Sequence, residues 1–197
     1  MQYGTPRNFI HNYHTKIEKN PIRDINQALI DVYYKYYPDD KGKVVPINKW
    51  NVYSFTPYFP IADKIQKFFA EHPDEISPLS KPFDGAKNFM GELCKIAKVT
   101  IVTYQRNKRW EEVSLEWLEK NNIDFHDIVF LKDKTKFKGM FLLDDCVHNL
   151  KLIKLAGNCI PVCKDYSWNK EWDGLRIVRY DEFLSIVRNS LEDIQVN

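Results

Sequence analysis

The segment FLKDKTKFKGMFLLDDC, residues 130–146, says most about how this chain folds. Lys134 lies in a polar turn, and the apolar run that follows ends in two adjacent carboxylates, Asp144 and Asp145. Such a run predicts a buried strand that carries both acids to the edge of a sheet. Adjacent carboxylates repel each other unless they share a cation, and Mg²⁺ prefers oxygen ligands. Because a lysine ammonium suits a phosphate, the segment predicts a site for a phosphate and a metal ion.

Segments typical of strands alternate with segments typical of helices in the second half of the chain. Strands are expected over residues 99–103, 128–131, 140–145, 159–163 and 176–180. Helices are expected over residues 85–96, 109–120, 150–155 and 182–188. This alternation predicts an α/β fold, with a Rossmann-like parallel sheet covered by helices on both faces. Ligands of such sheets bind at the carboxyl ends of the strands, where Thr103 and both acids would lie.

The first half of the chain has a different pattern. Apolar positions with helical spacing predict helices over residues 23–37 and 61–71, with proline-interrupted sequence between them. Residues 73–82 contain three prolines and are expected to form a connector.

Composition excludes several classes of protein. Lysine and arginine (29) nearly balance aspartate and glutamate (27), so the net charge of +2 does not favour bulk binding of nucleic acid. No apolar run reaches the length of a membrane span, and the N-terminus has no signal-peptide core. The four cysteines lack CxxC spacing and are expected to be buried, reduced thiols of a cytoplasmic protein.

Together these residues resemble the haloacid dehalogenase superfamily, and more narrowly the 5′(3′)-deoxyribonucleotidases. The resemblance depends on a strand that ends in Thr103, a later DKT tripeptide at residues 133–135 followed by Gly139, and then the LLDD run. Further matches are a helix start and a late aromatic–Asn dipeptide: Pro82, Gly85, Ala86, Trp168 and Asn169.

The resemblance implies roles for the site residues. Thr103, Tyr104 and Lys134 would bind the phosphate, and Asp144 and Asp145 would hold Mg²⁺. Catalysis in such a site depends on positioning and on charge stabilisation of the transferring phosphoryl group. Two further residues are expected to line the same pocket: Trp168 and Asn169.

The resemblance also implies a small helical cap inserted into the core. Residues 25–81 would form the cap, and residues 1–24 and 82–197 would form the haloacid dehalogenase-like core. Aromatic side chains of the cap would stack on a nucleobase or, alternatively, would form the cap's own core: Tyr53, Phe55, Tyr58 and Phe59.

The chain departs from the family at its first strand. Active members open with D-x-D-G, in which the first aspartate is the nucleophile and the second is the general acid and base. The preferred alignment puts Ile17 and Lys19 at these positions, and an alternative on residues 1–5 also lacks both aspartates. Isoleucine cannot attack phosphorus, and Glu18 would point to the opposite face of a strand. Lys19 offers a site without Mg²⁺, in which its ammonium pairs with the carboxylates.

Three functions remain open at this point. The favoured one is a catalytically impaired, nucleotidase-like protein that binds a nucleotide or small phosphate ester, or a protein partner. The second is an active, Mg²⁺-dependent nucleotidase or phosphatase with an atypical nucleophile or a true start upstream of Met1. The third is a structural or interaction protein whose site residues are relics.

Overall fold

The centre of the protein is a parallel sheet. The computed structural model describes residues 14–17, 20–105 and 107–196. Its six-stranded sheet has the order β5-β4-β1-β6-β7-β8, and every neighbouring pair is parallel. The strands are β1 (His14–Ile17), β4 (Lys98–Thr103), β5 (Asp127–Phe130), β6 (Phe141–Asp144), β7 (Ile160–Lys164) and β8 (Arg176–Ile177). The predicted α/β fold with a parallel sheet is therefore confirmed.

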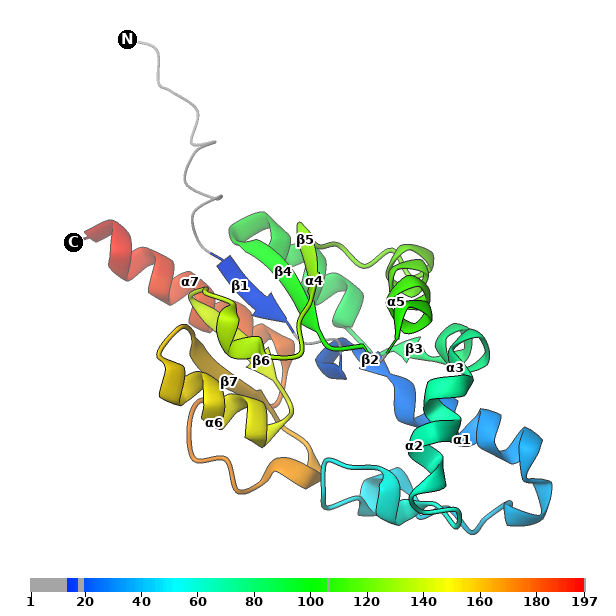
Figure 1. Ribbon diagram of the computed structural model, residues 1–197. Helices are drawn as coiled ribbons and strands as arrows, with labels where there is room; N and C mark the ends of the chain where they lie inside the picture. The colour runs from blue at the N-terminus through cyan, green and yellow to red at the C-terminus, as the bar shows by residue number, and fades with distance from the viewer. Residues whose placement is uncertain (1–13, 18–19, 106, 197) are drawn as a thin grey trace.

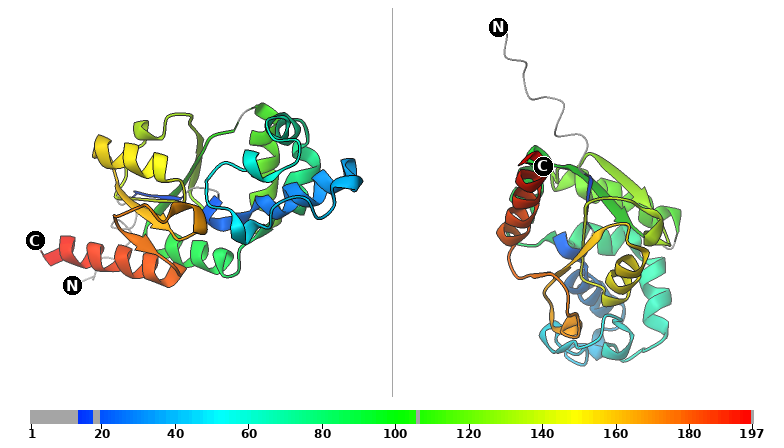
Figure 2. Two further views of the ribbon diagram at one scale, coloured as in Figure 1. Left: turned by 90° about the horizontal axis from the view of Figure 1, so that it is seen from below. Right: turned by 90° about the vertical axis from the view of Figure 1, so that its left-hand side faces the viewer.

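Helices cover both faces of this sheet, as Figure 2 shows. The helices of the core are α4 (Ala86–Ile96), α5 (Lys108–Lys120), α6 (Val147–Ala156) and α7 (Tyr180–Val196). Strand β6 shows how the two faces are built, because successive side chains of a strand point in opposite directions. Phe141 and Leu143 pack in one cluster with α4 and α7, whereas Leu142 packs with Ile153 of α6.

A helical insertion lies beside the sheet (Figure 1). It contains α1 (Ile25–Tyr36), α2 (Lys64–Glu71), α3 (Pro73–Leu79) and the 3-10 turns Pro38–Asp40, Ile47–Lys49 and Thr56–Tyr58. The chain enters it through β2 (Arg23–Asp24) and leaves it through β3 (Lys81–Pro82), which pair antiparallel. Its apolar side chains form a cluster separate from that of the sheet, so the insertion has a core of its own.

Helix α5 contributes to both apolar clusters. Trp110 and Val113, from its first half, belong to the cluster of the insertion. Trp117 and Leu118, one to two turns later, belong to the cluster of the sheet. One rigid helix therefore fixes the position of the insertion against the core.

Two sequence-based expectations are corrected. Residues 73–82 were expected to form a connector, but α3 occupies most of them. Pro73 is at the first helical position, where its missing N–H costs no hydrogen bond, and Pro78 lies in the last turn. The final strand is also shorter than expected, because α7 begins at Tyr180 and takes the last residue of the RIVRY segment.

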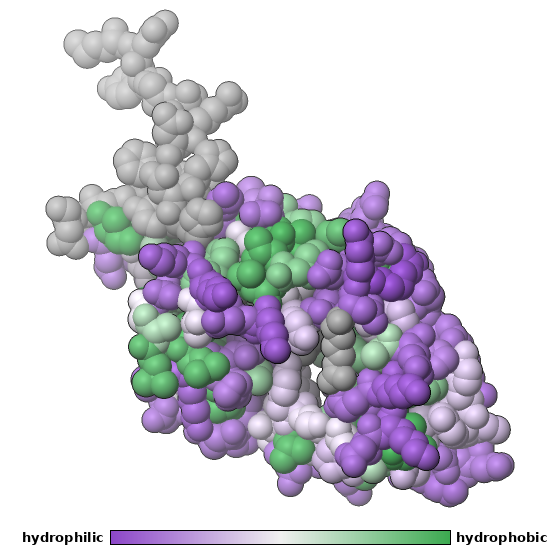
Figure 3. Space-filling model, viewed as in Figure 1, coloured by the Kyte–Doolittle hydropathy of each residue, from purple (hydrophilic) through white to green (hydrophobic). Residues whose placement is uncertain are grey.

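On the face seen in Figure 3, hydrophilic surface surrounds scattered apolar patches. Among the described residues, no helix combines the length and the apolar character needed to cross a bilayer. Cys146, Cys159 and Cys163 are buried, as expected, whereas Cys94 is only half-buried.

Candidate functional site

The candidate site begins where the central strands end. Strand β1 lies between β4 and β6, and its last residue, Ile17, pairs with Ile101 and Leu143. The ends of β4 and β6, at Thr103 and Asp144, therefore flank the end of β1. Ile17, which the preferred alignment puts at the position of the family's first aspartate, is the last residue of β1. Lys19 lies outside the described residues.

Asp144 is surrounded by donors. It is 1% exposed, its Oδ1 accepts the Cys146 N–H at 2.8 Å, and its Oδ2 accepts the Asn149 amide at 2.9 Å. Lys134 Nζ, on the 3-10 turn Lys134–Lys136, lies 3.6 Å from Oδ2. The lysine and the acid, ten residues apart in sequence, thus form a buried ion pair.

Asp145 faces the pocket instead. Asp145 is 3% exposed and lines the cavity, whereas Asp144 does not line it. Behind it, the side chain of Asn169 donates to the Asp145 carbonyl at 3.0 Å and to the Lys164 carbonyl at 2.8 Å. Asn169 is fully buried and does not line the pocket, so its expected place in the pocket is corrected to a supporting position.

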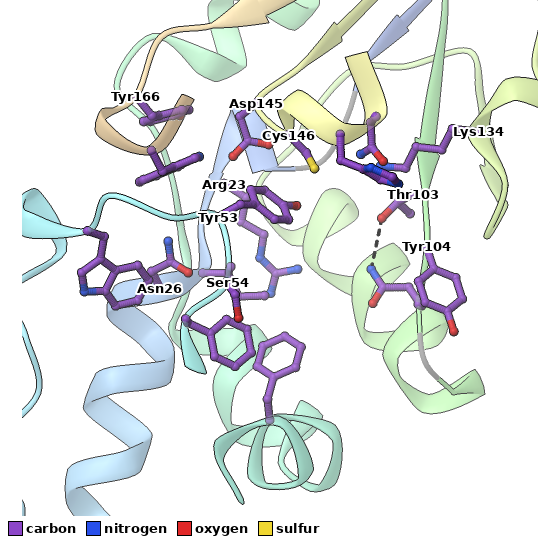
Figure 4. Close-up of a pocket in the computed structure, with 18 of the residues that line it drawn as sticks. Arg23, Asn26, Tyr53, Ser54, Thr103, Tyr104, Lys134, Asp145, Cys146 and Tyr166 are labelled. Atoms are coloured by element: carbon purple, nitrogen blue, oxygen red, sulfur yellow. Dashed lines mark hydrogen bonds between the residues drawn. The ribbon is translucent and has the colours of Figure 1, made fainter. Parts of the chain in front are cut away.

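The pocket is a cavity of about 540 Å³ between the sheet and the insertion. Thr103, Lys134 and Asp145 come from the core, as Figure 4 shows, and Tyr53 and Ser54 come from the insertion. Beside the pocket, Ser167 Oγ of the core donates to the carbonyl of Trp50 in the insertion at 2.5 Å. The aromatic side chains that line it are Trp50, Tyr53, Phe55, Phe69, Phe83, Tyr104, Tyr166 and Trp168.

The expected stacking residues of the insertion divide into two groups. Tyr53, which is 46% exposed, and Phe55 line the pocket. Tyr58 and Phe59 do not, because both are buried in the apolar cluster of the insertion. Tyr58 stacks on Trp50 with ring centroids 4.7 Å apart, and Phe59 meets Tyr33 edge-on at 5.1 Å. Phe59 is therefore part of the insertion's own core.

The remaining expected residues do line the pocket. Thr103 is 5% exposed, and its hydroxyl accepts a hydrogen bond from Gln105 at 3.4 Å. Tyr104 follows the same strand and is half-exposed, and Trp168 stacks on Tyr166 with ring centroids 4.5 Å apart. The structure brings Thr103, Tyr104, Lys134, Asp145 and Trp168 together around one cavity.

Sequence analysis missed several residues of the cavity wall, above all Arg23 and Cys146. Arg23 is 2% exposed, and an arginine between isoleucines at positions 22 and 25 is the signal that could have found it. Cys146 directly follows the acid pair, and burial raises the pKa of its thiol to about 12, with a further contribution from the charge of Asp144. The thiol therefore stays protonated and is a poor nucleophile at neutral pH.

The described strand ends offer a magnesium ion two carboxylates, Asp144 and Asp145. Mg²⁺ takes six oxygen ligands, and one or two carboxylates are its usual protein share beside substrate and water. Within the described ranges, no three His, Cys, Asp or Glu side chains gather as metal ligands. Both oxygens of Asp144 already accept hydrogen bonds, and Lys134 lies beside it. These donors compete with a metal ion for the oxygens of Asp144.

Solved structures show the same fold. YfnB of Bacillus subtilis, described as a HAD hydrolase bound to magnesium, matches with a TM-score of 0.58 and 13% identity over 89% of this chain and 99% of its own. A haloacid dehalogenase-like hydrolase of Xanthomonas campestris matches with a TM-score of 0.55 and 8% identity over 92% and 94%. A hydrolase of Streptococcus pneumoniae matches with a TM-score of 0.52 and 14% identity over 88% and 98%.

The family comparison is more specific than these structural similarities. No curated protein matches the sequence significantly. Residues 21–190 match the family model described as 5′ nucleotidase, deoxy (pyrimidine), cytosolic type C protein. The matched range contains Thr103, Lys134 and both acids, and it begins after Ile17 and Lys19. The chain therefore belongs to this 5′ nucleotidase family, within the haloacid dehalogenase superfamily.

Proposed function

We propose that the protein binds a nucleoside monophosphate, or a closely related phosphate ester, without hydrolysing it at an enzymatic rate. The observation that carries this proposal is the composition of the cavity wall. Lys134 and Thr103 supply a cation and a hydroxyl at the strand ends, and aromatic side chains line the insertion side. A phosphate suits the first group, and a flat apolar ring suits the second.

The side chains at the expected nucleophile position support the proposal that hydrolysis is slow. The preferred alignment puts Ile17 where the family's nucleophile belongs, and binding alone does not replace a nucleophile. Cys146 cannot take its place at neutral pH, because burial holds its pKa at about 12. The ion pair between Lys134 and Asp144 leaves a site that is electrostatically balanced before a ligand arrives.

We also propose that residues 25–81 serve as the cap of this site. The two connectors of the insertion, β2 and β3, pair with each other, so the insertion joins the core through one narrow link. Its residues Tyr53, Ser54 and Phe55 line the cavity opposite the strand ends. Asp24, just before the insertion, is the N-cap of α1, accepts the Gln27 N–H and does not line the cavity.

Calorimetry with deoxynucleoside 5′-monophosphates tests the binding. We expect Lys134→Met to weaken binding at least about tenfold, because a charge-assisted contact to the phosphate is lost. Lys136→Met is the matched control, since Lys136 is exposed on the same 3-10 turn and does not line the cavity. No binding to the wild-type protein, or an equal loss in both variants, would contradict the proposal.

A phosphate-release assay with Mg²⁺ tests the second half of the proposal. We expect a rate of phosphate release far below roughly 1 s⁻¹, which is the lower end of typical kcat values. If release is fast, Asp144→Asn tells whether it belongs to this site. Fast release that Asp144→Asn abolishes would establish an active phosphomonoester hydrolase with an unusual nucleophile.

A further inference from the structure

Arg23 is a buried cation that protein groups satisfy only in part. Its Nε donates to Ser80 Oγ at 2.5 Å, and its Nη2 donates to the carbonyl and the hydroxyl of Ser77 at 2.9 and 2.8 Å. The guanidinium also lies over the Trp117 ring, 4.6 Å from its centroid. Nη1 is buried and donates to no atom of the described residues.

No carboxylate of the described residues offsets the charge of this side chain. Burial lowers the pKa of Arg23 to about 9, and no acidic neighbour contributes to the shift. The guanidinium remains charged at neutral pH, so the part of the chain that the structure describes holds a buried cation without a described counter-ion. Buried charges are normally paired, and an unpaired one at a cavity wall indicates a group that arrives from outside.

The same cavity is lined by a second residue whose buried donor lacks a described acceptor. The indole Nε1 of Trp168 is buried and has no acceptor among the described residues. The ring is fixed by its stacking on Tyr166, with an interplanar angle of 7°. Two buried donors from distant parts of the chain therefore lack acceptors at one cavity, which favours a ligand that is rich in acceptors.

Arg23 lies apart from the expected phosphate site. In Figure 4, Thr103 and Lys134 lie on one side of the pocket, while Arg23 lies toward Ser54 and Asn26. Among the described lining residues Arg23, Lys132 and Lys134 are cationic, whereas Asp145 alone is acidic. The cavity thus has cationic groups at separate places, and one of them, Lys134, already pairs with Asp144.

We propose that this pocket accepts a ligand with two separated anionic groups, of the nucleoside bisphosphate class, and that Arg23 Nη1 receives the second one. This inference rests on the proposed function, in which the first phosphate lies at Thr103 and Lys134. An anion at Arg23 restores the missing counter-ion and accepts the unused N–H groups in a charge-assisted bond. A neutral carbonyl accepts the hydrogen bond but leaves the buried charge uncompensated.

Calorimetry with three ligands of the same base tests the inference on the unmodified protein. Thymidine 5′-monophosphate is the reference, thymidine 3′,5′-bisphosphate adds an anion at the far end, and thymidine 5′-diphosphate adds the same charge beside the first phosphate. We expect the bisphosphate to bind at least about tenfold more tightly than the monophosphate and more tightly than the diphosphate.

Two variants connect this preference to the named donors. Arg23→Met should bring the bisphosphate to within about twofold of the monophosphate, since the charged partner of the second anion is lost. Trp168→Phe keeps an aromatic ring beside Tyr166 and every described contact of Arg23, and it removes the indole donor together with the five-membered ring, so it should weaken the bisphosphate more than the monophosphate. It serves as the readout if Arg23→Met does not fold.

The outcomes separate the two proposals. Equal affinities for mono- and bisphosphate in the wild-type protein overturn the role of Arg23 while nucleotide binding stands. A preference for the diphosphate over the bisphosphate also overturns it, because the second anion then binds beside the first. An unchanged preference in a folded Arg23→Met protein has the same consequence. Absence of binding by all three ligands overturns both proposals.

Discussion

Asn169 satisfies four polar partners at the back of the site. Its amide donates to the carbonyls of Asp145 and Lys164, and its side-chain oxygen accepts from Tyr166 N at 3.1 Å and from Arg176 at 2.9 Å. We expect Asn169→Ala to lower the free energy of unfolding by about 2–4 kcal/mol, because several buried groups lose partners together. Urea unfolding followed by circular dichroism measures this loss.

Asn121→Ala is the matched control for that measurement. Asn121 makes one comparable hydrogen bond, from its amide to the Trp117 carbonyl at 2.8 Å, and is only partly buried. We expect it to cost about 1 kcal/mol or less. Similar losses in the two variants would show that the hydrogen-bond network around Asn169 has no special weight.

Single residues differ in how well the sequence predicts their place. Lys134 and Asp144 were found because one lies in a polar turn and the other ends an apolar run, and the structure places them on the 3-10 turn Lys134–Lys136 and at the end of β6. Arg23 was not found, because its partners Ser77 and Ser80 are distant in sequence and meet it only in the folded chain. Local pattern predicts which residues end a strand, but not which residues a second segment brings against them.

At the scale of elements, the start of α5 connects core and insertion. Asn107 is the N-cap of this helix, and its Oδ1 accepts the Trp110 N–H at 3.0 Å. Its amide donates to the Ala70 carbonyl of α2 at 3.2 Å. Asn107→Ala should therefore lower the free energy of unfolding by about 1–2 kcal/mol, which thermal or urea unfolding detects.

Asn107→Asp separates the two contributions. Aspartate keeps the capping acceptor and favours the helix N-terminus, but it cannot donate to Ala70. We expect this variant to lose less than Asn107→Ala, and Asp24→Ala at the N-cap of α1 to lose about 1 kcal/mol as a cap without an inter-helix bond. A loss in Asn107→Asp as large as in Asn107→Ala would place the whole effect in the Ala70 contact.

Elements of the core were easier to predict than those of the insertion. Apolar runs such as residues 99–103 have one structural solution in a buried parallel sheet, and β4 follows them closely. Residues 73–79 contain two prolines, and their helix depends on packing of Ile76 in the insertion's cluster. Tertiary packing decides such short segments, and local propensity does not show it.

At the scale of the whole molecule, burial opposes ionisation of thiols and phenols in both apolar clusters and beside the site. The pKa values of these side chains are raised chiefly by burial: Cys94, Cys146, Cys163, Tyr33, Tyr166 and Tyr180. The unfolded chain ionises these groups at lower pH than the folded protein does. Stability is therefore intact below the ordinary pKa values, about 8.5 for thiols and 10 for phenols, and declines as pH rises through them.

We expect the urea midpoint of the reduced protein to stay constant between about pH 7 and 8 and to fall from about pH 9 upward. Arg23 acts in the opposite direction, because its pKa is lowered to about 9 and the unfolded state then binds more protons. It offsets only part of the loss, since several acids oppose one base. Unfolding series at stepped pH, with absorbance at 295 nm for the phenols, measure the profile.

Tyr166→Phe tests whether buried phenols cause this loss of stability at high pH. Burial, followed by the charge of Asp145, raises the pKa of Tyr166, and phenylalanine keeps the ring that stacks on Trp168. The variant should therefore match the wild-type protein near pH 7 and lose stability less steeply above pH 10, about where free phenols ionise. Phenols that all titrate near their ordinary pKa while the far-ultraviolet spectrum stays native would contradict the assignment, because buried neutral tyrosines ionise only when the fold opens.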